Sequence, residues 1–281
     1  MPPVAHPVLP AIVLAFGPAW AGGSMAGPSP PEPPTPSSST SNAPRAADAI
    51  EAPVALTSEP SHHLILTTDR VRIFRVEVPP HGSTLMHQHD RDYVWIALGD
   101  VDILNAVAGG AVTRVTVPDA GLVFARGGFA HVARNQSAAP FRNLTIEFLK
   151  PQTSPHNRCA PALRDQPTEC APGELTPPKG RRGVTRVTEF ETRETRISLL
   201  SLEPRARFTI EPSASPPLLL ALDGAEAEAL VRLSLPGGGT GAGTRPLRTA
   251  DALEVPPGLG VELRNTGERP ARFLVLETEA G

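Results

Sequence analysis

The sequence predicts an all-β protein made of two tandem jelly-roll barrels that follow a disordered, Pro- and Ser-rich N-terminal segment. Three observations support this prediction. Short segments alternate between apolar and polar residues with a period of two, as half-buried strands do. Gly- and Pro-containing turns separate these segments at regular spacing, which is typical of sandwiches and jelly rolls. Finally, the second half of the chain repeats the first.

Strands are predicted between His63 and Lys150. Residues 71–78 alternate in the two-residue period, whereas residues 93–98 form a continuous apolar run that indicates a strand buried on both faces. Alternation returns at residues 112–117 and 144–149. The turns between them are marked by Pro79-Pro80, Gly109-Gly110, Asp119-Ala120-Gly121 and Gly127-Gly128.

Residues 183–281 repeat this unit. The segment from Arg72 to Pro80 matches the segment from Arg196 to Pro204 without a gap. After a Gly-rich insertion, the match resumes at Gly128 with Gly258, Asn135 with Asn265, Pro140 with Pro270, Arg142 with Arg272 and Glu147 with Glu277. Two copies of one barrel explain this self-similarity better than one large sandwich does.

The N-terminal region differs in composition from the barrels. Residues 1–23 contain an apolar stretch followed by Ala19-Trp20-Ala21, which predicts an export signal and a periplasmic or secreted protein. No Lys or Arg precedes the stretch, so a disordered Ala- and Pro-rich leader is the alternative. Residues 24–60 are rich in Pro and Ser and predict an extended, solvated linker.

The remaining boundaries are 61–150 for the first barrel, 151–182 for a connector and 183–281 for the second barrel. Both cysteines of the chain, Cys159 and Cys170, lie in the connector. In an oxidising compartment this pair would close a local disulfide, which agrees with export. Two free thiols in a loop are the alternative.

Charge and hydropathy restrict the classes of partner. The 281-residue chain has a net charge of −3, which argues against a nucleic-acid-binding protein with its basic surface. The apolar run near the N-terminus is shorter than the roughly 20 residues that span a membrane, so no span is expected after processing. A homo-oligomer is compatible with the sequence.

Three histidines form the candidate site. His87 and His89 are separated by one residue on a predicted strand, so both side chains point to the same face and can reach one metal ion. His131 follows a Gly-bearing turn and can face the same cavity. Each element alone is a weak signal, whereas the two together predict a metal site.

These elements resemble the two motifs of the cupin superfamily. The first motif (Gly, a spacer, His-x-His, a carboxylate, Gly) is matched by Gly82, His87, His89, Asp92 and Gly99. The second is matched by Gly121, Gly128, His131 and Asn135. Arg126 stands where the family has a Pro. With the internal repeat, the resemblance implies a bicupin with a degenerate second domain.

The second copy lacks the histidines. Glu211 and Ser213 stand at the positions assigned to His87 and His89, and Val261 stands at that of His131. One carboxylate cannot hold a transition metal ion against water. The C-terminal barrel is therefore expected to be metal-free, with a structural or pocket-forming role.

The resemblance implies a carboxylate ligand after His-x-His, and its identity stays open. Counting back from Gly99 selects Asp92, whereas counting forward from His89 selects Tyr93. Three arrangements are open. In the one that we favour, Asp92 binds the metal, which would need a bulge in the strand. Alternatively, Asp92 orients an imidazole, or the site has three histidines with Tyr93 nearby. His62, His63 and His81 lie near strand ends and are expected at the surface.

The ligand set suits one divalent transition metal ion in the N-terminal barrel, and the sequence does not distinguish Fe, Mn, Ni, Cu, Co and Zn. The resemblance implies a dioxygenase or an isomerase acting on a small organic molecule. No catalytic residue other than Tyr93 is indicated. One alternative is a non-catalytic module that binds a small ligand through the metal, and another is a storage-like bicupin with a vestigial site.

Overall fold

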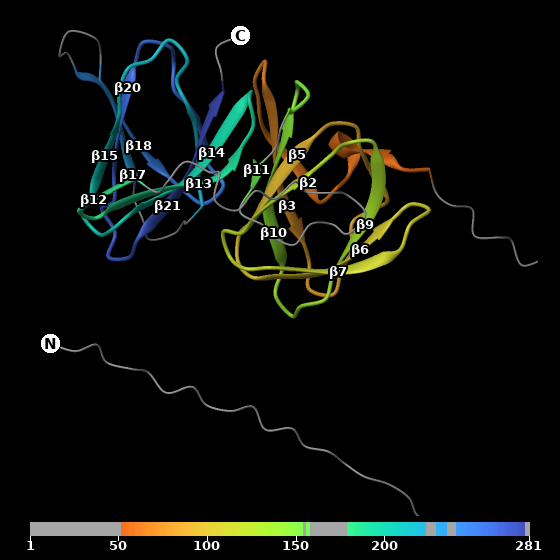
Figure 1. Cartoon of the computed structure of the whole chain (residues 1–281). Coiled ribbons are helices and arrows are strands. Elements are labelled where there is room, and N and C mark those ends of the chain that lie inside the picture. Colours follow the sequence, from red (N-terminus) through yellow and green to blue (C-terminus); the bar gives the residue numbers. More distant parts are fainter. Residues whose placement is uncertain (1–51, 154–155, 158–178, 223–228, 235–239, 279–281) are drawn as a thin grey trace, which may run out of the picture. The chain divides into compact units, whose positions relative to one another are not determined.

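The computed structural model describes residues 52–153, 156–157, 179–222, 229–234 and 240–278 (Figure 1). These residues form β-strands and one 3-10 turn, η1 (Leu56–Ser58). The first ten strands are β1 (Val54–Ala55), β2 (His62–Thr67), β3 (Val71–Val78), β4 (His87–His89), β5 (Tyr93–Ala97), β6 (Val101–Val107), β7 (Val112–Val117), β8 (Leu122–Ala125), β9 (Phe129–Asn135) and β10 (Phe141–Phe148). The all-β, two-barrel prediction is confirmed.

Eleven further strands follow. They are β11 (His156–Asn157), β12 (Lys179–Arg181), β13 (Val184–Glu191), β14 (Thr195–Leu202), β15 (Arg207–Ile210), β16 (Leu218–Ala221), β17 (Ala229–Ser234), β18 (Thr240–Leu247), β19 (Ala252–Glu254), β20 (Gly260–Arg264) and β21 (Ala271–Thr278). The described strands of the second barrel begin at β12, and β11 pairs with β13 from the connector side.

Two five-stranded sheets form the first barrel. One has the order β1-β4-β9-β6-β7 and the other has the order β2-β3-β10-β5-β8. Strand β5, read from the sequence as a continuous apolar run, is buried at all five positions. The side chains that the two sheets direct inward form a core that includes Phe74, Trp95 and Ile103. The histidine-bearing strands β4 and β9 are neighbours in the first of these sheets.

The second barrel repeats this arrangement with a sheet of order β11-β13-β14-β21-β16-β19, to which β12 is added, and a sheet of order β15-β20-β17-β18. The two copies share a side-chain device. The Asn135 amide donates hydrogen bonds to the carbonyls of Val78, Pro79 and Ala139. The Asn265 amide does the same with Leu202 and Arg269. The Asn of the second motif therefore ties a loop to a strand end in both copies.

The first barrel begins earlier than the sequence predicted. Strand β1 pairs in parallel with β4, so that Val54 lies opposite His87. Leu56 in η1 is buried in the barrel core, and the Glu59 side chain is also buried. Residues 54–60 thus belong to the barrel, and the expectation that the linker extends to residue 60 is corrected. The amino-acid composition did not indicate this, because Pro53 and Pro60 flank a segment in which Leu56 is the one long apolar side chain.

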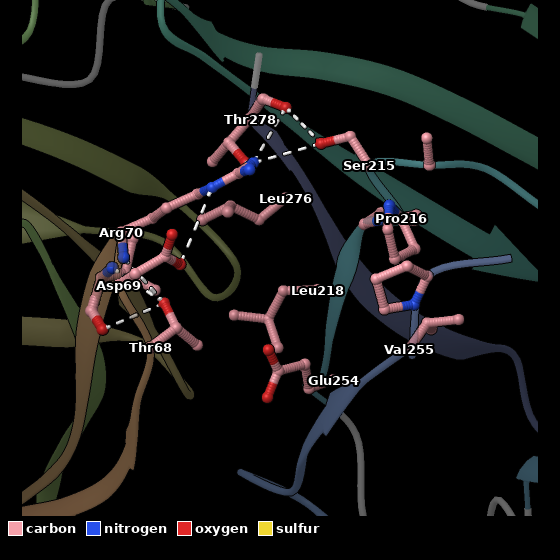
Figure 2. A pocket seen from close by; sticks show the side chains of 14 residues that line it. Thr68, Asp69, Arg70, Ser215, Pro216, Leu218, Glu254, Val255, Leu276 and Thr278 are labelled. Carbon is pink, nitrogen blue, oxygen red and sulfur yellow. Dashed lines mark hydrogen bonds and ion pairs between the residues drawn. The ribbon is translucent and has the colours of Figure 1, made fainter. Parts of the chain in front are cut away.

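A shared apolar cluster joins the two barrels. Phe190 of β13 is fully buried and stacks against Phe124 and Phe148 of the first barrel, with ring centroids 5.1 and 5.8 Å away. A polar contact adds to it: the Arg70 guanidinium donates hydrogen bonds to Ser215 and Thr278 (Figure 2). A hollow of about 250 Å³ opens beside Arg70, and none of the residues that line it is a histidine.

Several expectations fall on residues outside the described part of the chain. These are the export signal at 1–23, the linker up to residue 51, and the pair Cys159 and Cys170. Within the described part of the chain, no helix is long and apolar enough to cross a membrane.

Phe190 tests the interface between the barrels. We expect Phe190→Ala to lower the free energy of unfolding by about 3–5 kcal/mol, because it removes a buried ring from a cluster that serves both barrels. Urea denaturation monitored by circular dichroism measures the loss. Val112→Ala, at an exposed position, is the control and should change stability by less than about 0.5 kcal/mol. A loss of under about 1 kcal/mol for Phe190→Ala would contradict the assignment.

Candidate metal centre

Three imidazoles meet inside the first barrel because of strand geometry. His87 and His89 alternate with the half-buried Gln88 on β4, so both rings point inward. The antiparallel register of β4 and β9 places His131 directly opposite His87. The ring centroids lie 4.4 Å apart for His87 and His131, and 5.1 Å apart for His89 with each of the other two. The structure therefore brings the three predicted histidines together.

Each of the three rings has a buried nitrogen without a hydrogen-bond partner, namely Nε2 of His87, Nδ1 of His89 and Nε2 of His131. The three residues are 1%, 2% and 8% exposed. A buried polar atom without a partner is costly, and such atoms usually have a partner or an unseen ion. Three of them on neighbouring imidazoles fit the donor set of a transition metal ion.

Outer hydrogen bonds fix the orientation of two of these rings. The Leu85 carbonyl can only accept, so Nδ1 of His87, 2.9 Å away, carries the proton and Nε2 presents its lone pair. Nδ1 of His131 likewise faces Oδ1 of Asn105, and its Nε2 is left free. Such partners are the usual support of metal-ligating histidines. Asn105 was not singled out from the sequence, because nothing in its neighbourhood marks it.

The surroundings keep these imidazoles neutral. Burial is the main cause and lowers the pKa of His87 to about 4, with the nearby His62 adding to the effect. Burial together with the neighbouring imidazoles also holds the pKa values of His89 and His131 well below the ordinary value. At neutral pH all three rings therefore offer lone pairs rather than positive charge, as metal ligands must.

His62 also belongs to this cluster, and the expectation that it lies at the surface was wrong. It opens β2, is 9% exposed, and its ring centroid is 4.7 Å from that of His87. Potential ligand atoms of His62, His87 and His89 all lie within 4.8 Å of one another. Nothing in the sequence indicated this position, because β2 is far from both motifs. His63 is exposed, as expected.

Glu59 faces His62 from the turn before β2. Its Oε2 accepts from Nδ1 of His62 at 2.6 Å and from the Ser61 amide, and its Oε1 accepts from the Leu85 amide. Burial by itself would raise the pKa of Glu59, but the hydrogen bonds from His62 and Leu85 outweigh it and lower the pKa. The carboxylate is therefore ionised at neutral pH.

Comparison with known proteins assigns the fold. Neither a family model nor a curated protein matches the sequence. The structure is similar to the oxalate decarboxylase of Lactobacillus farciminis in its formate complex, with a TM-score of 0.50 and 12% identity over 75% of this chain and 78% of that one. Another oxalate decarboxylase structure gives 0.51, with 13% identity over 75% and 70%. The chain has the bicupin fold. A variant of the Bacillus subtilis oxalate decarboxylase gives 0.50, with 13% identity over 76% and 70%.

Tyr93, not Asp92, faces the histidines of this bicupin. The Tyr93 ring stacks on His89, with centroids 4.0 Å apart and planes inclined by 14°. Burial, followed by the nearby Glu147, raises the pKa of Tyr93, so the phenol keeps its proton. Of the three arrangements left open by the sequence, the structure has the one in which Tyr93 lies beside the imidazoles.

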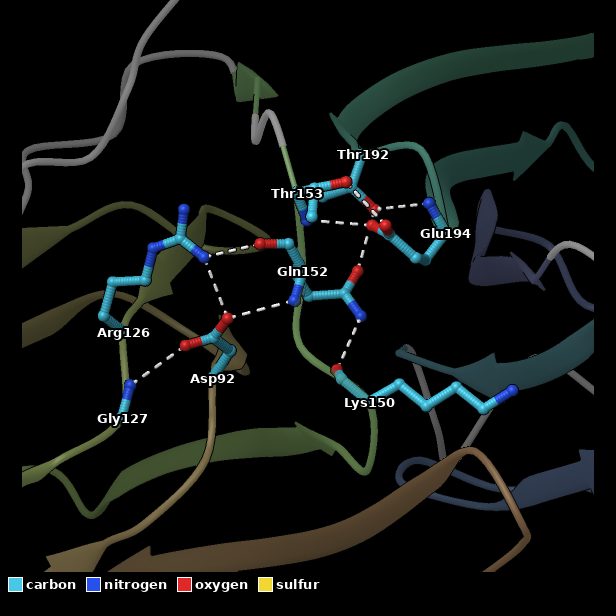
Figure 3. Close-up of polar contacts among 8 residues, drawn as sticks. All are labelled: Asp92, Arg126, Gly127, Lys150, Gln152, Thr153, Thr192 and Glu194. Carbon is cyan, nitrogen blue, oxygen red and sulfur yellow. Dashed lines mark hydrogen bonds and ion pairs between the residues drawn. The ribbon is translucent and has the colours of Figure 1, made fainter.

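Asp92 points away from the cluster, and its assignment as a metal ligand is corrected. One of its oxygens accepts from Arg126 and from the Gln152 amide, and the other accepts from the Gly127 amide (Figure 3). The interpretation that Asp92 orients an imidazole fails as well, because these partners are not histidines. The reason is the two-residue period of the strand: residues 92 and 93 face opposite sides, and Tyr93 faces inward.

The second barrel of the bicupin has a different interior. Val261 is fully buried and is paired in register with Ile210 of β15. The sequence alignment had placed Glu211 at the position of His87. The register differs by one residue, and such a shift reverses the face that a side chain takes. Glu211 is accordingly exposed. Leu263 and Val255 help to fill the core of this barrel.

Asp92→Asn separates a positioning role from a ligand role. The amide nitrogen would meet hydrogen-bond donors that now meet a carboxylate, so we expect a loss of about 1–3 kcal/mol in the free energy of unfolding. Metal content, measured by elemental analysis, should stay equal to that of the wild type. Asp90→Asn, at an exposed position in the same turn, is the matched control. Loss of the metal from a folded Asp92→Asn protein would restore Asp92 as a ligand.

Proposed function

We propose that the protein is a metal-dependent bicupin whose first barrel binds one divalent transition metal ion through His87, His89 and His131 and acts on a small molecule in a dioxygenase-like reaction. The observation that supports this most is the set of unpartnered nitrogens on three buried, neighbouring imidazoles. Hydrogen bonds from outside the cluster already orient two of the rings toward such an ion.

The chain contributes orientation, a dry environment and one protic group. A redox metal ion held there would supply the capacity to bind and activate dioxygen. Trp95, Ile103 and Phe141 line the site beside polar side chains such as Asn105 and Thr145. The burial of the three histidines limits the access of bulk water to their rings. Tyr93 keeps its phenolic proton beside His89 and can donate a hydrogen bond to a bound molecule.

The size of the cavity favours dioxygen chemistry over sugar isomerisation. The space among the imidazoles is about 40 Å³, a few times the roughly 10–15 Å³ that a cavity needs to hold one water. A diatomic molecule fits there, whereas a sugar-like molecule is several times larger. None of the described residues that line the cavity is Lys or Arg, which favours an uncharged organic substrate entering beside the metal.

Metal analysis tests the proposal. The full chain, loaded with Fe²⁺ or Mn²⁺ and desalted, should retain about one equivalent, because one cluster of imidazoles is present. A double variant, His87→Ala with His131→Ala, should retain none, while His63→Ala should match the wild type. Dioxygen consumption with a panel of small uncharged substrates then tests the reaction. A wild-type protein that stays metal-free after loading would overturn the metal site, and no dioxygen uptake by the loaded protein would overturn the reaction.

We also propose that the protein is exported. The apolar stretch with Ala19-Trp20-Ala21 in residues 1–23 supports this, together with the pair Cys159 and Cys170. Mass spectrometry of protein expressed with its own N-terminus should find a chain shortened near residue 21 outside the cytoplasm. An unshortened chain that stays in the cytoplasm would contradict export.

A further inference from the structure

We infer that His62 is a fourth metal ligand, positioned by Glu59, so that an imidazole replaces the carboxylate in the ligand set of this barrel. This inference rests on the proposed metal site and adds a residue that lies outside both motifs. It also assigns a role to a buried acid–histidine pair that the three-histidine site does not use.

The position of His62 is the first support. Its ring centroid lies 4.7 Å from that of His87 and 6.3 Å from that of His89. Its potential ligand atom and those of His87 and His89 all lie within 4.8 Å of one another. His62 reaches this place from β2, which belongs to the other sheet of the barrel. The cluster thus receives imidazoles from both sheets, as a closed coordination site requires.

The hydrogen bonding of His62 is the second support. Glu59 is 2% exposed, and its carboxylate accepts three hydrogen bonds, from Nδ1 of His62 and from the amides of Ser61 and Leu85. An ionised carboxylate can only accept, so Nδ1 of His62 carries a proton, and in the neutral ring Nε2 then carries the lone pair. This is the arrangement already found for His87 with the Leu85 carbonyl and for His131 with Asn105.

Leu85 links the two outer partners directly. Its amide donates to Glu59 at 3.0 Å, and its carbonyl accepts from His87 at 2.9 Å. The orientation of His62 is therefore coupled, through Glu59 and the backbone of Leu85, to that of His87. Carboxylates that hold metal-ligating histidines in this way are a common second layer of metal sites.

The charge balance is the third support. In the family's ligand set a carboxylate touches the metal, but here Tyr93 faces the cluster and Asp92 points elsewhere. Glu59 supplies the negative charge instead, as the hydrogen-bond partner of His62 and not as a direct ligand. The competing explanation is a purely structural pair, in which His62 only holds Glu59 through their hydrogen bond and does not bind the metal.

Cobalt binding to the full chain distinguishes these explanations. The variants are His62→Ala, His62→Gln and Glu59→Gln, and the matched control is His63→Ala, the exposed neighbour on the same strand. The dissociation constant of Co²⁺ is measured by competition with a chromophoric chelator, and its visible absorption spectrum reports the ligand set. Far-UV circular dichroism establishes folding, and His62→Gln makes the comparison should His62→Ala fail to fold.

We expect Glu59→Gln to weaken Co²⁺ binding by about 10–100-fold, as loss of an outer partner does. His62→Ala should weaken it further and should change the visible spectrum, and added imidazole should restore both by entering the space that the side chain leaves. His63→Ala should bind as the wild type does. Unchanged affinity and spectrum, or tighter binding, in the folded His62 variants would overturn the inference in favour of the structural pair. A wild-type protein that binds no Co²⁺ would instead overturn the metal site itself.

Discussion

The antiparallel pairing of β4 with β9 is the constraint on which the candidate site depends. It sets His131 opposite His87, and the strand period adds His89 on the same face. Because these strands direct the imidazoles into the apolar interior of the barrel, the rings are shielded from water and stay neutral. The cost of the unpartnered nitrogens is one that a bound metal ion would offset.

The two barrels show that this fold does not depend on its histidines. The Asn that ties a loop to a strand end occurs in both, at Asn135 and Asn265, with equivalent carbonyl partners. Where the first barrel pairs His131 with His87, the second pairs Val261 with Ile210. Apolar side chains fill the second interior at ordinary cost, whereas the buried imidazoles of the first leave ring nitrogens without hydrogen-bond partners. The histidines of the first barrel are therefore best explained by what they bind.

The segment before β2 changes the character of the site. In the sequence it resembles the end of a Pro-rich linker, yet it supplies β1, η1 and Glu59 to the barrel. A ligand set made only of imidazoles, with the carboxylate moved to an outer position, would leave the metal with a higher net charge than a directly bound carboxylate would.

The sequence by itself determined the all-β class, the two copies and the candidate ligands His87, His89 and His131, because strand period, internal repetition and the two histidine motifs can be read along the chain. It could not choose between Asp92 and Tyr93, since motif spacing leaves one residue of freedom and only the pairing of β5 decides which side chain faces inward. The same freedom misplaced Glu211 by one residue. His62, Glu59 and Asn105 emerged only from the tertiary structure, because closing the barrel brings together strands whose contacts leave no regular spacing in the sequence.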